Sequence, residues 1–330
     1  MTTRAVVRFR TRAGAWETGV VDAGADGGLT LREGTDASAP RLGGVVTGGF
    51  TDAHVHLSLV PAAELTGGVL GRVIDLGGEP AHLAATADAA ERAGLRVEFA
   101  GPFLTAPGGY PSDRTWAAAG SFREVAGAGD IRAAVADVAG HGASLIKVAG
   151  NSTAGPVLGD EDLRTVVTEA RRHGLPVVVH AEGPGEAVRA ARLGAHLLAH
   201  APFTEVLADD DLRAMARGTG WISTLDIHGW GRHDEHYAIA TSNIRRFRAV
   251  GGRVIYGTDL GNGPLPVGLN ARELAALADA GMASTDILDA LSPLDPLQPH
   301  TPLVHIPGDD PSALRLPDAR PLTARHLQEL

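Results

Sequence analysis

The sequence predicts an α/β protein built on an eight-stranded parallel barrel, a (β/α)8 fold, and three features of the chain support this. From residue 49 onward, short apolar runs of strand length alternate with alanine-rich amphipathic stretches of helix length. Such alternation is typical of a parallel sheet covered by helices on both faces. There are eight runs, which favours a closed barrel over an open doubly wound sheet. The barrel is expected to span residues 49–289.

The runs predicted as barrel strands are short, and most end beside a polar residue or a glycine. They are GFTDAHVHL (49–57), RVIDLGG (72–78), LRVEFAG (95–101), SLIKVAG (144–150), PVVVHAEG (176–183), HLLAHAP (196–202), GWISTLD (220–226) and RVIYGTD (253–259). Helices are expected between most of them, at residues 80–93, 130–141, 160–173 and 239–250. Several of these helices are followed by glycine, as in RRHG and RAVGG, which is a common helix stop.

Both ends of the chain are expected to lie outside the barrel. Residues 1–48 contain the short β segments RAVVRF, WETGVV and LTL, separated by turns rich in Gly and Asp. The tail is rich in proline, and its segments LVHIPG and ALRLPD read as further strands, with a helix signal only in the last residues. Residues 1–48 plus 290–330 are therefore expected to form a small β-sandwich domain, complete or reduced.

Composition excludes several classes of function. The formal net charge is −10 and no basic cluster is present, so neither nucleic acid nor an anionic membrane is an expected partner. The absence of cysteine excludes disulfides, thiolate metal sites and a cysteine nucleophile. No membrane-spanning apolar run and no secretory signal is recognised, so the cytoplasm is the expected location. The expected partner is a small-molecule substrate, and a homo-oligomer is left open.

Polar side chains stand at the ends of five predicted strands, where a (β/α)8 barrel carries its active site. These are His54 and His56 of the first strand, Lys147 of the fourth, His180 of the fifth, His200 of the sixth and Asp259 of the eighth. Residues two apart in a strand point to the same side, so both imidazoles of the His-Val-His segment can bind one metal ion. The pair alone could also be two ordinary polar residues at a strand end. Burying the whole set without a shared partner would, however, be costly.

Lys147 is the only lysine of the chain, because the other 28 of its 29 basic residues are arginines. It lies in an apolar run, and burial can lower the pKa of a lysine by several units. A neutral amine can add CO2 and become a carbamate, whose carboxylate can bridge two cations about 3.5–4 Å apart. Arginine stays protonated and cannot do this. We expect a carbamate on Lys147. The alternative is an unmodified ammonium paired with Asp259, beside a single metal ion.

These polar residues and the segments around them resemble the amidohydrolase superfamily, in the branch related to imidazolonepropionases and Xaa-Pro dipeptidases. The segments are GGFTDAHVHL, GRVIDLGG, AGPFLTAPGG, HGASLIKVAG, EARRHGLPVVVHAEG and AVGGRVIYGTD, within residues 45–282. The resemblance implies a (β/α)8 barrel beside a small β-sandwich. It also implies one metal held by His54, His56 and Asp259, a second held by His180 and His200, and a carboxylated Lys147 that bridges them with a hydroxide. The loop GGYPSDR departs from the pattern, with Tyr110 where relatives often have histidine, and the tail motif is reduced to PSALRLPDARPL.

The expected activity is hydrolysis of a C–N bond in an amide, a lactam, an N-acyl amino acid or a dipeptide. A metal-bridged hydroxide would attack the carbonyl, and Asp259 would pass the proton to the leaving nitrogen. Two zinc ions are the expected cofactors, and other divalent metals are left open. Three alternatives remain: a single-metal deaminase or cyclic-imide hydrolase with unmodified Lys147, a decarboxylase, and a catalytically silent binding protein on the same fold.

Substrate recognition is expected from the loops after the third and seventh strands. The candidate residues are Tyr110, Arg114, His228, Trp230 and Arg232. Arg114 or Arg232 could clamp a substrate carboxylate, although each, taken singly, is better explained as an ordinary surface arginine. The segment GRHDEHY, with His233 and His236, has a metal-like composition but is expected to start a solvated helix.

Overall fold

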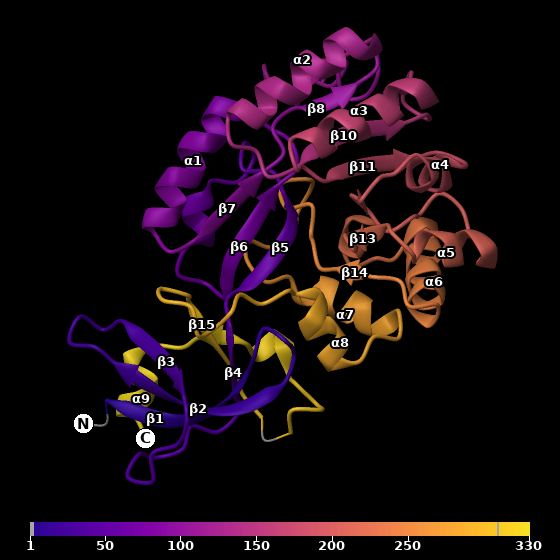
Figure 1. The fold of residues 1–330 in the computed structure, drawn as a ribbon. Helices are drawn as coiled ribbons and strands as arrows, with labels where there is room; N and C mark the ends of the chain where they lie inside the picture. The colour runs from indigo at the N-terminus through magenta and orange to yellow at the C-terminus, as the bar shows by residue number, and fades with distance from the viewer. Residues whose placement is uncertain (1–2, 309) are drawn as a thin grey trace.

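The chain folds into a larger part of parallel strands and helices and a smaller part of mainly antiparallel strands (Figure 1). The structure is a computed structural model, and it describes residues 3–308 and 310–330. The larger part holds the middle of the chain, and the smaller part is made from both of its ends.

The strands of the larger part form two parallel sheets. One sheet contains β5 (Phe50–Val55), β6 (Leu70–Asp75) and β7 (Arg96–Phe99). The other, in the order β14-β13-β12-β11-β10-β8-β9, contains β8 (Phe103–Thr105), β9 (Phe122–Glu124), β10 (Ile146–Asn151), β11 (Val177–Glu182), β12 (Leu197–Leu198), β13 (Gly220–Ile222) and β14 (Val254–Ile255). A strand lies within each of the eight predicted runs, so the prediction of an α/β fold with parallel strands is confirmed.

Hydrogen bonds connect the two sheets at both of their edges. The third predicted strand is interrupted after Phe99, so that β7 pairs with β6 while β8 pairs with β10. The interruption contains Gly101, whose φ of 71° suits glycine, and a proline that cannot donate to a ladder. At this edge Ser144 N donates to Phe99 O at 2.9 Å. At the other edge Ala53 N donates to Tyr256 O at 3.0 Å, which brings the end of β5 beside the segment after β14.

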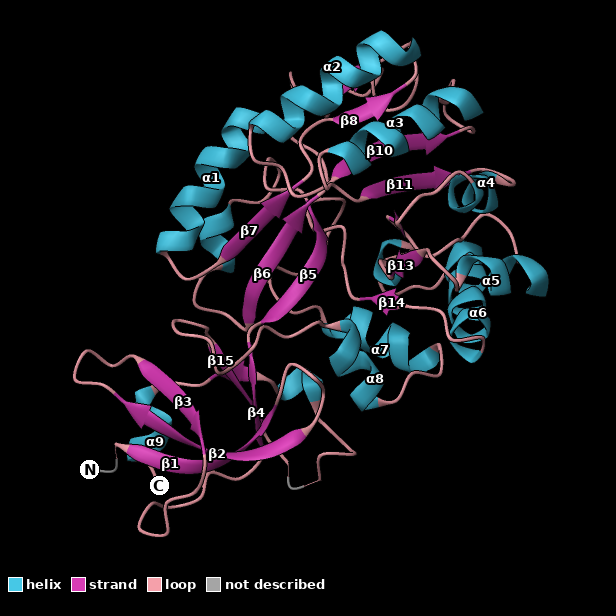
Figure 2. Ribbon diagram, viewed as in Figure 1, coloured by secondary structure: helices cyan, strands magenta, loops and turns pink. Residues whose placement is uncertain are grey.

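Helices cover the outer faces of these strands (Figure 2). They are α1 (Pro80–Arg92), α2 (Gly127–Gly140), α3 (Asp160–Arg172), α4 (Glu186–Arg192), α5 (Asp209–Met215), α6 (Glu235–Ala249), α7 (Ala271–Asp279) and α8 (Ser284–Ala290), with 3-10 turns η1 (Ala62–Leu65) and η2 (Leu225–Ile227). Four of them, α1, α2, α3 and α6, match the predicted helices. α6 begins earlier than expected because the Asp234 side chain caps it by accepting from Tyr237 N at 2.9 Å. The Trp221 ring of β13 stacks on Phe247 of α6, with ring centroids 3.8 Å apart.

The two chain ends share one six-stranded sheet with the order β16-β15-β4-β1-β2-β3. Its strands are β1 (Arg4–Arg10), β2 (Trp16–Ala23), β3 (Leu29–Glu33), β4 (Val45–Gly48), β15 (Leu303–Ile306) and β16 (Arg320–Pro321), and α9 (Ala324–Gln328) packs nearby. A separate apolar cluster that includes Phe9 and Leu327 stabilises this part. The β-sandwich itself stays a prediction, because the described strands of the two ends form a single sheet.

One local expectation for the tail is wrong. The segment ALRLPD is not a strand but contains the 3-10 turn η3 (Leu316–Asp318). Its proline lacks the N–H that a strand ladder needs and suits the first turn of a helix. The other tail expectations are confirmed, since LVHI forms β15 and a short helix, α9, lies near the carboxyl terminus.

Among the described residues, no helix combines the length and the apolar character needed to cross a membrane.

Candidate metal centre and active-site cavity

A cavity of about 420 Å³ lies at the carboxyl ends of the parallel strands, and all six polar residues singled out in the sequence line it. They are His54, His56, Lys147, His180, His200 and Asp259. The parallel strands position them, because each belongs to β5, β10 or β11 or lies shortly after β5, β12 or β14. The structure therefore brings together residues that are up to 205 positions apart in the chain.

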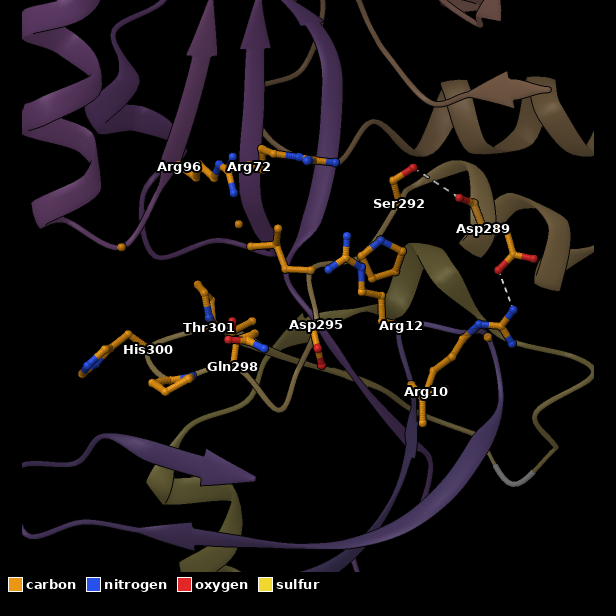
Figure 3. A pocket seen from close by; sticks show the side chains of 18 of the residues that line it. Arg10, Arg12, Arg72, Arg96, Asp289, Ser292, Asp295, Gln298, His300 and Thr301 are labelled. Atoms are coloured by element: carbon orange, nitrogen blue, oxygen red, sulfur yellow. Dashed lines mark hydrogen bonds and ion pairs between the residues drawn. The ribbon is translucent and has the colours of Figure 1, made fainter. Parts of the chain in front are cut away.

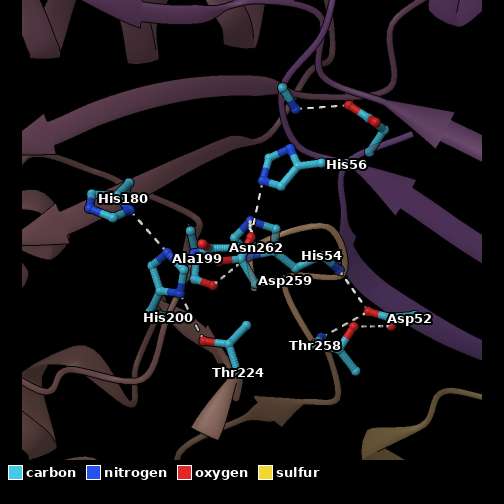
Figure 4. Close-up of polar contacts among 12 residues, drawn as sticks. Asp52, His54, His56, His180, Ala199, His200, Thr224, Thr258, Asp259 and Asn262 are labelled. Carbon is cyan, nitrogen blue, oxygen red and sulfur yellow. Dashed lines mark hydrogen bonds and ion pairs between the residues drawn. The ribbon is translucent and has the colours of Figure 1, made fainter. Parts of the chain in front are cut away.

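The first group in the cavity consists of two histidines around one carboxylate (Figure 4). His54 Nε2 lies 3.1 Å and His56 Nε2 lies 3.0 Å from the same oxygen, Asp259 Oδ1. The other nitrogen of His54, Nδ1, lies 2.9 Å from the carbonyl oxygen of Ala199. Because a carbonyl can only accept, Nδ1 carries the proton and Nε2 of the neutral ring presents a lone pair to the carboxylate.

The protonation of His54 fits a bound cation. Burial lowers the pKa of His54 to about 4 although the charge of Asp259 opposes it, so the ring is neutral at pH 7. A lone pair and a carboxylate oxygen 3.1 Å apart repel each other unless a positive charge lies between them. Two imidazole nitrogens and a carboxylate oxygen are a donor set that Zn²⁺ accepts. The ligand atoms of these three residues all lie within 4.8 Å of one another.

The second group consists of two histidines whose ring nitrogens face each other. His200 Nε2 lies 2.9 Å from His180 Nδ1. His180 Nε2 donates to Glu182 Oε2 at 3.0 Å, which leaves Nδ1 as the nitrogen that can offer a lone pair. Burial and the neighbouring His180 hold the pKa of His200 well below its usual range. His200 Nδ1 contacts Thr224 Oγ1 at 2.8 Å, so this group presents two nitrogen ligands with oriented rings.

Lys147 is almost completely buried in the same cavity, with 1% of its surface exposed. Burial lowers its pKa to about 7, against the attraction of Asp259 and Asp75. Its Nζ lies 5.6 Å from the centroid of the Phe103 ring. Within the described residues no ion pair joins Lys147 to Asp259. A large fraction of this amine is therefore neutral at pH 7, which is the form that adds CO2.

Several supporting residues were not recognised in the sequence. The Asp75 carboxylate accepts from Leu57 N at 2.6 Å and from Gly77 N at 2.8 Å, which ties the end of β6 to the loop after β5. Glu182 orients His180 and accepts from Asn151 Nδ2 at 2.7 Å. The available signal was their position, because Asp75 lies in the second predicted strand run and Glu182 follows His180 by two residues.

Asp52 holds the first strand to the loop that carries Asp259. Its Oδ1 accepts from His54 N at 3.1 Å and from Thr258 N at 3.0 Å, and its Oδ2 accepts from Thr258 Oγ1 at 2.6 Å (Figure 4). Two ligands of the first group are thus placed by one fully buried side chain. Asp259 itself has a left-handed backbone with φ of 60°, a strained conformation that this link helps to maintain.

We expect Asp52→Ala to lower the free energy of unfolding by about 2–4 kcal/mol, because it leaves buried donors without an acceptor. The same change should weaken metal binding by about 10–100-fold, as is typical when a ligand loses its support. Urea unfolding with a chelator and calorimetric zinc titration measure the two effects separately. Asp52→Asn is the matched control, since its amide oxygen still accepts from both backbone N–H groups. Equal losses of stability and of zinc affinity in Asp52→Ala and Asp52→Asn would contradict this role of Asp52.

The structure separates the five candidate substrate residues into two sets. Tyr110 lines the cavity and stacks on His180, with ring centroids 5.5 Å apart, and His228 also lines it. Arg114, Trp230 and Arg232 are not among the residues that line it. The aromatic residues Phe103, Trp116 and Phe203 line the cavity and were missed, because nothing in their local sequence distinguishes them from core residues.

The segment GRHDEHY contains the start of a helix, as expected from the sequence. α6 begins at Glu235, and the His233 ring stacks on Tyr237, with centroids 3.8 Å apart. His236 lies near His228 and Asp234, in a looser group in which two of the three residues are exposed.

A larger cavity of about 690 Å³ lies at the opposite ends of the strands, beside the terminal sheet (Figure 3). It is lined by several arginines, of which Arg10 pairs with Asp289 and Arg96 pairs with Glu98. None of the metal-ligand candidates lines this cavity. The chemistry predicted from the sequence therefore belongs to the smaller cavity.

The fold and the histidine–carboxylate site define a class of metal-dependent hydrolases. A family model described as the amidohydrolase family matches residues 45–292, and the chain therefore belongs to the amidohydrolase family. The resemblance seen in the sequence motifs is confirmed. Membership of this family supports a hydrolase that uses divalent metal and acts on a small molecule.

Solved structures show the same fold. An amidohydrolase is 18% identical with a TM-score of 0.70, and the match covers 97% of each chain. A Xaa-Pro dipeptidase with bound methionine in its active site is 18% identical with a TM-score of 0.69, covering 94% of this chain and 95% of that one. The A. niger ochratoxinase is 17% identical with a TM-score of 0.70, covering 99% and 92%. None of the curated proteins compared with the chain matches its sequence significantly.

Proposed function

We propose that this protein hydrolyses a C–N bond, in an amide, a lactam, an N-acyl amino acid or a dipeptide, with two divalent metal ions. The observation that carries the proposal is the contact of a neutral, lone-pair-bearing His54 Nε2 with the carboxylate of Asp259. We further propose that the two parallel sheets close into one (β/α)8 barrel over residues 49–289. Residues 1–48 and 290–330 would then form the accompanying β domain.

The residues present fit a two-metal centre. His54, His56 and Asp259 would hold one ion, His180 and His200 would hold the second, and a carbamate on Lys147 would bridge them. The bridge is supported by the burial of Lys147, its pKa of about 7 and its place in the same cavity. When bound, zinc ions supply Lewis acidity and lower the pKa of water towards neutrality.

Asp259 is suited to move a proton during the reaction. Burial raises its pKa, but the contact with His56 is among the interactions that outweigh burial and hold the pKa well below the usual range, so the side chain is ionised at pH 7. Asn262 Nδ2 donates to its Oδ2 at 2.8 Å and fixes the plane of the carboxylate. We propose that Asp259 accepts the proton of the attacking water and delivers it to the leaving nitrogen.

Zinc titration of chelator-treated protein, combined with hydrolysis assays on a panel of amides and lactams, tests the proposal. We expect two equivalents of zinc per chain, and hydrolysis that a chelator abolishes and zinc restores. His233→Ala is the matched control and should keep both equivalents, because His233 stacks on Tyr237 outside the cavity. A single equivalent would favour the mononuclear alternative. Hydrolysis that persists in excess chelator would overturn the metal mechanism.

A further inference from the structure

Beyond the six ligand candidates, most of the residues that line the cavity are aromatic or aliphatic. Beyond the six ligand candidates, the apolar and aromatic residues that line it are Leu59, Phe103, Tyr110, Trp116, Phe203 and Ile227. Apart from Lys147, no lysine or arginine is among the described residues that line this cavity. The surface available to a substrate therefore offers dispersion and stacking contacts but no free cationic side chain.

One wall is a continuous set of rings that begins at the metal-ligand candidates. The Phe103 ring lies 5.8 Å from His56, and the Trp116 ring lies 6.3 Å from Phe103 and 6.1 Å from Tyr110. Trp116 is 44% exposed although it is a large apolar residue. A flat ligand that covers such a ring at the edge of a cavity removes its apolar surface from water, so the ring favours the binding of flat ligands.

A second wall lies beside His200 and is also uncharged. Phe203 lies 6.1 Å from His200 and 4.6 Å from His228, measured between ring centroids. Burial lowers the pKa of His228 to about 4, so this histidine is neutral at pH 7. Leu59 also lines the cavity and is 44% exposed. These residues would contact a substrate group through apolar surface.

The fixed charges of the cavity disfavour an anionic substrate group. Glu182 is part of the lining and accepts from His180 Nε2 at 3.0 Å, so its carboxylate offers a substrate acceptor oxygens and no cationic partner. Arg114, the nearest candidate clamp, contacts Asp113 at 3.3 Å, and its guanidinium lies 5.6 Å from the centroid of the Tyr110 ring. A carboxylate bound between these walls would lose water without gaining an arginine or lysine partner.

We propose that the substrate is an uncharged amide or lactam that carries a flat apolar or aromatic group next to the scissile bond. N-acyl amino acids and dipeptides with a free carboxylate would then be poor substrates. The inference rests on the proposed function, because it describes the substrate of the same metal site.

Two anilides that differ in one para substituent, an uncharged methyl group or a carboxylate, test this inference: 4-methylacetanilide and 4-acetamidobenzoate. They share one scissile amide and one ring, and only the second bears a carboxylate. We expect kcat/KM of the zinc-loaded protein for the methyl compound to be at least about tenfold higher, the discrimination that about 1.4 kcal/mol provides. Binding to chelator-treated protein is measured as well, so that the carboxylate cannot bind a cation directly.

Two substitutions at exposed lining positions make the test specific. Trp116→Ala should weaken binding of 4-methylacetanilide by about tenfold, in line with the loss of an aromatic contact, and leave zinc content unchanged. Leu59→Arg should shift the preference towards 4-acetamidobenzoate by adding the missing cation. Val206 is an exposed apolar residue outside this cavity, and Val206→Ala is the control. It should change neither the binding of 4-methylacetanilide nor the preference between the two anilides.

The outcomes separate the two proposals. Equal or tighter binding of the carboxylate compound to the chelator-treated wild-type protein would overturn the substrate inference while leaving the hydrolase proposal intact. Selective, Trp116-dependent binding of 4-methylacetanilide supports the inference even without turnover. Absence of hydrolysis across the whole amide and lactam panel by protein with full zinc content would instead count against the proposed function.

Discussion

Lys147→Arg is expected to reduce kcat/KM by about 10³-fold and to lower the zinc content below two equivalents, as happens when a shared ligand of a catalytic unit is lost. Arginine keeps the positive charge, but its guanidinium stays protonated and cannot form a carbamate. Zinc analysis of the purified protein and steady-state kinetics on the same sample measure both effects.

Two further variants separate the loss of the carbamate from a packing defect. Lys147 is buried beside Phe103, so the larger arginine could also strain the site. Lys147→Met keeps the length of the side chain and lacks the amine, and it should show the same loss. Lys147→Ala should regain activity when propionate is added, because a free carboxylate can occupy the space of the missing side chain. Arg217→Lys, which changes an exposed residue, is the control and should alter neither the zinc content nor kcat/KM.

The reloading of the carbamate should depend on pH in a defined direction. The pKa of Lys147 is about 7, and only the neutral amine reacts with CO2. In protein stripped of metal and CO2, the fraction able to react therefore rises as the pH increases through 7. At a fixed concentration of dissolved CO2, reactivation should be faster at pH 8 than at pH 6. Full activity and two zinc ions in Lys147→Met would contradict the bridging role.

Asp259→Asn is expected to lower kcat by about 10²–10⁴-fold, the range that a positioned general acid–base group contributes. The amide keeps the shape of the side chain and an oxygen towards the two histidines, but it cannot accept the proton at neutral pH. Asparagine also tolerates the left-handed backbone that this position adopts, with φ of 60°, so the loop should remain in place.

The balance of kcat against zinc affinity distinguishes proton transfer from a weakened ligand. The pKa of Asp259 is held well below its usual range, so the wild-type carboxylate is ionised at neutral pH and can accept the proton, whereas the amide of Asp259→Asn cannot. Zinc affinity, measured by titration, should fall far less than kcat. Asp234→Asn is the matched control at an exposed carboxylate that caps α6. An unchanged kcat in Asp259→Asn would exclude it as the proton carrier.

The strand ends of the larger part could be predicted because they follow from local pattern. A buried parallel strand must be apolar along its length, so a polar residue such as His180 or Asp259 at its end is conspicuous in the sequence. Lys147 was recognised in the same way, as a single lysine inside an apolar run. The supporting acids Asp52 and Asp75 also interrupt apolar runs, but their role appears only through the backbone N–H groups from which they accept hydrogen bonds.

Residues of the substrate cavity could not be assigned in this way. Trp116 and Phe203 contact the site only because their loops fold over the strand ends, and an aromatic residue in a loop has no periodic pattern to reveal that. Arg114 has the right chemistry for a carboxylate clamp and lies next to Tyr110 in space, yet it is not part of the cavity lining. Charge and residue type alone therefore overestimated the polarity of the site.

The sequence by itself determined the alternation of strands and helices, the metal-ligand candidates and the one amine that could be carboxylated. These features depend on the pattern of apolar and polar residues over five to ten neighbouring positions. That pattern can be read directly from the sequence. Only the tertiary structure decided which nitrogen of each histidine faces the centre, how Asp52 and Glu182 support the ligands, and that the cavity lining contains no arginine. Those properties arise from contacts between segments far apart in the chain, where the packing of one loop against another selects the partners.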